Sequence, residues 1–131
     1  MSCPSEICTF NSNYSAAENA VIPFGTIARR YGRNCQLDGN GINLIGAGYY
    51  DFTSSISFTP TATGPVTFQL MQDGTAVPGA LVSFSGTAAS TTPASLKFTL
   101  RNCGCNCNSV LTVTTSAAGI VDNMATVVEK K

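Results

Sequence analysis

The chain has 131 residues, of which 11% are charged, and its seven basic and seven acidic residues give a formal net charge of zero. This balance disfavours nucleic-acid binding, which needs a basic excess, and no apolar run approaches the roughly 18 residues of a membrane span. The first residues also lack the basic and apolar regions of a secretory signal, so we expect the chain to be made in the cytoplasm.

The first segment, residues 1–20, is polar and irregular, with at most one helical turn at Ser15–Glu18. We expect it to be an N-terminal arm that becomes ordered on a partner. The remaining residues, 21–131, are expected to form one domain, since the length fits a single domain and no linker divides it.

Apolar and polar residues alternate with the period of two typical of strands in four segments, which are 50–58, 66–70, 96–100 and 111–114. Such alternation buries one face of a strand and leaves the other wet. Tyr49 and Tyr50 should therefore point to opposite faces. We expect Tyr50 in the core of the subunit and Tyr49 on the outside.

Turn residues separate these segments at Asp38-Gly39-Asn40-Gly41, Thr63-Gly64-Pro65, Asp73-Gly74 and Pro78-Gly79. No helical stripe is present. Several short strands at this spacing predict an all-β sandwich or barrel. The small charged fraction further suggests that partner subunits cover much of the surface.

The sequence contains no His and no Trp, so the usual general base and the commonest metal ligand are missing. Its seven acidic residues are scattered, and no Gly-rich phosphate loop is present. These observations predict a protein that is not an enzyme, with no catalytic residue and no cofactor.

Six cysteines leave three interpretations open. Cys103, Cys105 and Cys107 project to one face if that stretch is extended, and they are weak candidates for binding a soft metal. Their spacing differs from the Cys-x-x-Cys of structural zinc. Alternatively, they form disulfides with Cys3, Cys8 or Cys35, or all six remain reduced structural thiols.

The stretch Gly41–Phe58, with Gly48-Tyr49-Tyr50-Asp51-Phe52 at its centre, leads from an apolar strand through a Gly to an aromatic strand. Val66–Val77 follows as a hairpin. In these features the chain resembles tumour-necrosis-factor-like and complement globular-head jelly rolls, over roughly residues 22–128. The resemblance implies an antiparallel jelly-roll sandwich that assembles as a homotrimer. Tyr49 and Asp51 are the candidate interface residues.

Phage and bacterial members of this family include virion surface proteins, and the chain has no Gly-X-Y stalk. We therefore expect a structural virion protein, a capsid decoration or head-fibre subunit bound to its lattice through the arm. Deleting residues 1–20 would then spare the trimer and abolish attachment. The alternatives are a glycan- or receptor-binding head and a cysteine-cross-linked spore-surface or cell-surface component. For a binding head, the candidate loops are Thr61–Pro65, Ser85–Pro93 and Cys103–Asn108.

Overall fold

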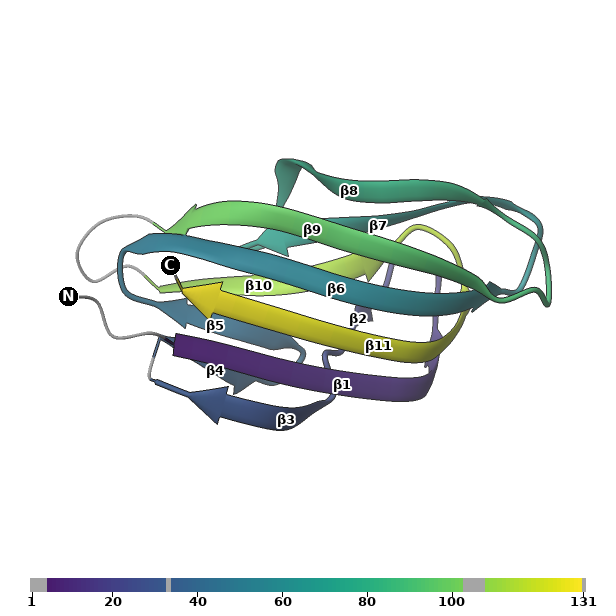
Figure 1. Ribbon diagram of the computed structural model, residues 1–131. Coiled ribbons are helices and arrows are strands. Elements are labelled where there is room, and N and C mark those ends of the chain that lie inside the picture. The colour runs from purple at the N-terminus through teal and green to yellow at the C-terminus, as the bar shows by residue number, and fades with distance from the viewer. Residues whose placement is uncertain (1–4, 33, 103–107, 131) are drawn as a thin grey trace.

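The computed structural model describes residues 5–32, 34–102 and 108–130, which form two antiparallel sheets packed face to face (Figure 1). The first sheet has the order β3-β1-β11-β6-β9. Its strands are β3 (Thr26–Tyr31), β1 (Ser5–Ala16), β11 (Gly119–Lys130), β6 (Gly48–Pro60) and β9 (Thr92–Asn102). The prediction of an all-β antiparallel jelly-roll sandwich is confirmed.

The second sheet has the order β4-β5-β10-β7-β8, with β2 added beside β10. Its strands are β4 (Cys35–Asp38), β5 (Gly41–Ile45), β10 (Asn108–Thr115), β7 (Gly64–Gln72), β8 (Thr75–Gly86) and β2 (Val21–Ile22). Strands that are distant in sequence therefore become neighbours. No helix within the described ranges is long and apolar enough to cross a membrane.

The core lies between the sheets and is built by the alternating residues of the sequence. In β6, Tyr50, Phe52, Ile56 and Phe58 are buried, as their shared parity predicts. Phe68 of β7 meets Phe58 edge to face, with ring centroids 5.3 Å apart. Aromatic pairs in this arrangement add to the stabilisation that burial of each ring contributes.

The predicted turns are present with one exception. Asp73 and Gly74 have φ values of +53° and +79° and join β7 to β8 as a tight hairpin. Pro78 and Gly79, in contrast, lie within β8, where the pairing with β7 shifts register and Gly79 has a φ of +83°. Because β8 is an edge strand, it tolerates both the missing amide of Pro78 and the irregularity.

The prediction of an irregular arm over residues 1–20 is wrong for residues 5–16. These residues form β1, which pairs with β11 on one side and with β3 on the other. Ile7 and Ala16 of this strand are buried in the core. The domain therefore includes Ser5 and the residues that follow it. A boundary at residue 21 would cut through its first sheet. Residues 1–4 lie outside the described ranges.

Candidate functional site

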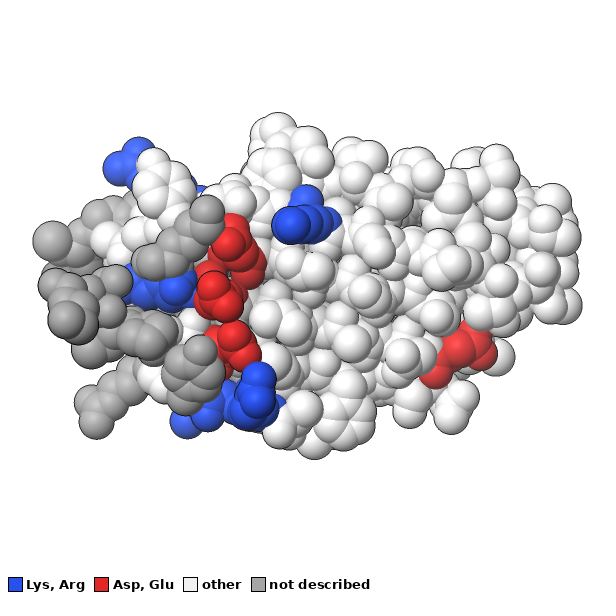
Figure 2. Space-filling view, in the orientation of Figure 1, with Lys and Arg blue, Asp and Glu red and all other residues white. Residues whose placement is uncertain are grey.

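The candidate site is the face of the five-stranded sheet that is turned away from the core, here called the outer face (Figure 2). Strand alternation places Tyr49 and Asp51 on this face, because Tyr50 and Phe52, which alternate with them along β6, are fully buried. Tyr49 lies opposite Arg101 of β9, and Asp51 lies opposite Thr99. The two candidate interface residues therefore share one surface.

The neighbouring tyrosines have opposite environments, as predicted. Tyr50 is 0% exposed, and its hydroxyl donates to the carbonyl oxygens of Ile45 and Gly46 at 3.0 and 2.9 Å. Burial raises the pKa of this hydroxyl above its usual value. Tyr49 is 54% exposed. The orientation of both side chains is confirmed, and the role of Tyr49 in an interface stays a prediction.

Three carboxylates form a row across the central strands of the outer face, here called the carboxylate row. Glu6 of β1 lies opposite Glu129 of β11, and Glu129 lies opposite Asp51 of β6. Thr99 donates a hydrogen bond of 2.7 Å to Asp51. Figure 2 shows this row running across the strands, with basic side chains beyond both of its ends. Like charges directly opposite each other in a sheet are unfavourable.

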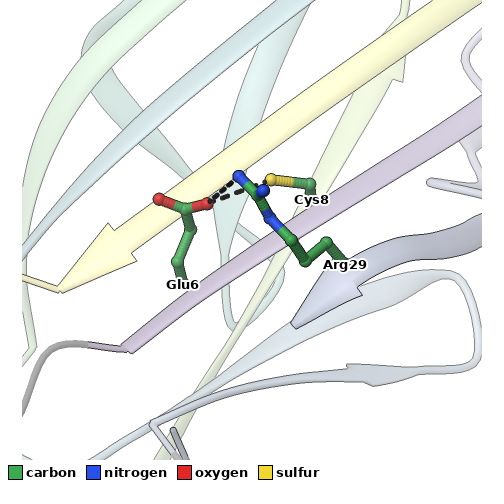
Figure 3. A network of polar contacts seen from close by, with 3 residues as sticks. All are labelled: Glu6, Cys8 and Arg29. Carbon is green, nitrogen blue, oxygen red and sulfur yellow. Dashed lines mark hydrogen bonds and ion pairs between the residues drawn. The ribbon is translucent and has the colours of Figure 1, made fainter. Parts of the chain in front are cut away.

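At one end of the row, Glu6 contacts two further side chains (Figure 3). The Arg29 guanidinium of β3 lies 3.5 Å from Glu6 Oε1, and the Cys8 thiol donates to the same oxygen at 3.3 Å. Burial, followed by the hydrogen bond to Glu6, raises the pKa of the Cys8 thiol. A protonated thiol is a poor nucleophile, so this arrangement is not suited to cysteine catalysis.

Apolar side chains are also exposed on the outer face. Phe10 of β1, with Val127 and Ile120 of β11, alternates with inward-facing neighbours and points to solvent. Phe10 is 48% exposed. Between these side chains and β9 the surface consists of small residues such as Ser55 and Ala125, which lie opposite each other. A flat face with exposed apolar groups is suited to contact with another protein.

The structure contains Cys8 and Cys35 as free thiols, so they form no disulfide with each other. Cys3, Cys103, Cys105 and Cys107 lie outside the described residues. Within residues 5–32, 34–102 and 108–130, no group of three or more Cys, Asp or Glu side chains is arranged to hold a metal ion. The disulfide and metal interpretations of the other four cysteines stay predictions.

Cys35 is expected to react with iodoacetamide only after unfolding. The thiol is fully buried, and burial raises its pKa from 9.0 to about 12. Because the unfolded thiol loses its proton above pH 9 while the folded thiol keeps it, Cys35 also lowers the free energy of unfolding as pH rises from 9 towards 12. Peptide mapping by mass spectrometry checks the labelling, with the protein in urea without reductant as control. Rapid modification of the folded chain would contradict this burial.

Two of the three candidate binding loops lie at one end of the sandwich. Thr61–Pro65 contributes to a cavity of about 380 Å³, and the Ala88 amide of the Ser85–Pro93 loop donates to Thr63. The third loop follows Asn102 at the opposite end of β9, and its residues 103–107 are not described. The strand ends that flank this third loop therefore lie away from the other two loops. Small side chains line the cavity, together with one carboxylate, Glu18.

Sequence reasoning found Tyr49 and Asp51 but missed Glu6, Phe10 and Glu129. The first two were assigned to the arm, and Glu129 was treated as one of several scattered acids. Only the antiparallel register of β1 on β11 and β11 on β6 brings the three carboxylates into one row.

The chain is similar to known proteins in structure, whereas comparisons of sequence find no match. No protein-family model matches the chain, and no curated protein matches it. Among solved structures, the phage PRD1 vertex protein P5 matches with a TM-score of 0.64 and 15% identity, over 97% of this chain and 96% of that one.

Two animal proteins have the same architecture. The Eiger TNF of S. frugiperda matches with a TM-score of 0.62 and 12% identity, over 98% of this chain and 91% of that one. The globular domain of the zebrafish complement 1qA protein matches with a TM-score of 0.56 and 12% identity, over 96% and 94%. The chain therefore has the jelly-roll fold of tumour-necrosis-factor-like and complement globular-head domains, as its sequence predicted.

Proposed function

We propose that the chain is a non-enzymatic structural protein that assembles as a homotrimer on the surface of a virion, as a capsid decoration or head-fibre subunit. The observation that carries this proposal is the outer face, where Phe10, Val127 and Tyr49 are exposed on the same side of the sheet as small neutral side chains such as Ser55 and Ala125. A second copy would bury this surface and remove its apolar groups from water.

The fold supports the same assignment. The phage protein that matches nearly end to end is a vertex protein, and the present chain spans 97% of its own length in that match. A compact jelly roll with a low charge, used as a building block, is consistent with such a role. Since residues 5–16 form β1 within the sheet, they are not a free arm that could reach a lattice.

The chemistry of the outer face supports a contact surface over an active site. The carboxylate row lies on the face of a sheet, and the described cavity is lined by other residues, at the loops around Thr61–Pro65. The sequence has no His to act as a general base, and the Cys8 thiol is held in its protonated form. These features favour binding between protein surfaces.

Tyr49→Asp is expected to weaken assembly while leaving the subunit folded, because it adds a charge to a half-exposed position of the outer face. Light scattering after gel filtration should give three copies of the 13.6 kDa chain for the wild type and a smaller mass for the variant, with an unchanged β-type circular dichroism spectrum. The matched control is Tyr50→Asp, one residue away and fully buried, which should unfold the subunit. A monomeric wild type would overturn the homotrimer.

The virion location is tested separately. Purified particles from the source of the gene should contain the chain when they are analysed by mass spectrometry, and antibodies against it should label their surface. Particles that lack the chain would contradict the virion role. The trimer would then have to function somewhere other than on a virion.

A further inference from the structure

The outer face carries opposite charges on its central and edge strands. The three central strands contribute the carboxylate row of Glu6, Glu129 and Asp51. The edge strand β9 contributes Lys97 and Arg101, which lie opposite Thr53 and Tyr49 and therefore share this face. Figure 2 shows basic side chains beyond both ends of the row and also beside it. The surface is thus complementary to a second copy of itself.

Within one subunit, two members of the carboxylate row, Glu6 and Glu129, carry like charges on neighbouring strands. Members of the row lie directly opposite one another, which is unfavourable in a sheet. Arg29 pairs with Glu6 at 3.5 Å, where the Arg29 side chain is 74% exposed and that of Glu6 13%, so this ion pair offsets charge at the Glu6 end of the row. Glu129, at the centre of the row, is exposed. A cationic partner from outside the subunit would offset the repulsion.

The register of the sheet places the two cations of β9 on either side of the height of the row. Asp51 is opposite Thr99, and Lys97 and Arg101 lie two residues to either side of Thr99 along β9. In a ring whose axis runs along the strands, each copy presents the same residue at the same height. An edge that contacts a different face of the next copy makes a heterologous interface, and such an interface gives a ring when the rotation between copies closes, as it does in a trimer.

The position of β9 at the edge supports this arrangement. Charged side chains on an edge strand resist direct extension of the sheet by another strand. A neighbouring copy would therefore contact this edge through side chains. Val127 lies next to the row on β11 and Phe10 lies further along β1 on the same face, and both would exclude water from the contact. Charge pairs that are partly removed from water define the register of an interface.

We propose that the carboxylate row of one copy binds Lys97 and Arg101 on the β9 edge of a second copy, and that these charge pairs determine how the copies are aligned. The inference rests on the proposed homotrimer and adds to it the partner residues and the ionic character of the contact. Association should therefore weaken when either sign is reversed, and it should recover when both signs are reversed in the same chain.

The test uses sedimentation velocity of the full chain. Glu129→Arg alone is expected to weaken association roughly tenfold or more, and so are Lys97→Glu or Arg101→Glu alone. Combining Glu129→Arg with one of the two β9 substitutions should restore association to within about threefold of the wild type. Glu18→Arg makes the same charge change at the Glu18 turn beside the cavity and should have no effect.

Failure of the homotrimer and failure of this inference alone give different results. A wild type that sediments as a monomer overturns the homotrimer and this inference together. A wild-type oligomer that Glu129→Arg leaves intact overturns the inference alone, as does a failure of both combined variants to recover association. Circular dichroism of each variant confirms that the subunit is folded, which is expected because reversing Glu129 relieves repulsion within the row.

Discussion

A chain that begins at residue 17 is expected to lose its fold, because the deletion removes β1 from the interior of a sheet. β1 pairs with β11 from Ser5 to Ala16 and with β3 from Glu6 to Phe10. Its loss would expose one edge of β11, detach β3 and take Ile7 out of the core. Unpaired strand edges also favour aggregation. This is the opposite of the result expected for a mobile arm.

Circular dichroism and gel filtration measure the outcome of this deletion. The control is addition of a synthetic peptide of residues 5–16, which should restore the β-type spectrum by pairing with the vacant edge of β11. A truncated chain that melts like the full chain would show that β1 contributes little to the domain and would reinstate the arm.

The failure to predict β1 has a physical cause in its residues. The strand turns Ser5, Ile7 and Thr9 inward and Phe10 outward, so its polar and apolar residues are distributed against the usual rule. Asn13, with a φ of +53°, then interrupts the pairing with β11 and changes which parity faces the core. Periodicity carries no clear signal for such a strand, which is held in place by its two neighbours.

The strands that were predicted have the reverse property. In β6 and β9 every second residue is apolar over most of the strand, and burial follows that parity. The same parity separated Tyr49 from Tyr50 correctly. What the sequence could not supply was the partner of each strand. The carboxylate row joins residues more than 40 positions apart, and only the sheet order brings them together.

The interior and the outer face should respond differently to the loss of a phenyl ring. Phe68→Ala is expected to lower the free energy of unfolding by about 3–5 kcal/mol, a large fraction of the roughly 5–15 kcal/mol typical of a domain. Phe68 is fully buried, and its ring packs against Phe58 and Phe84 at centroid distances of 5.3 and 5.8 Å. The cavity left by its removal would lie between the two sheets, where the neighbouring rings cannot close it.

Phe10→Ala is the matched variant, because it removes the same ring from the outer face, where Phe10 is 48% exposed. Here the ring contributes less to the subunit and more to contact with a second copy, so association should weaken while the isolated subunit keeps its stability. Urea titrations at two protein concentrations separate the effects, since only the contribution of assembly depends on concentration. Equal losses of unfolding free energy for both variants at every concentration would mean that Phe10 acts within the subunit. Phe10 would then no longer support self-association through the outer face.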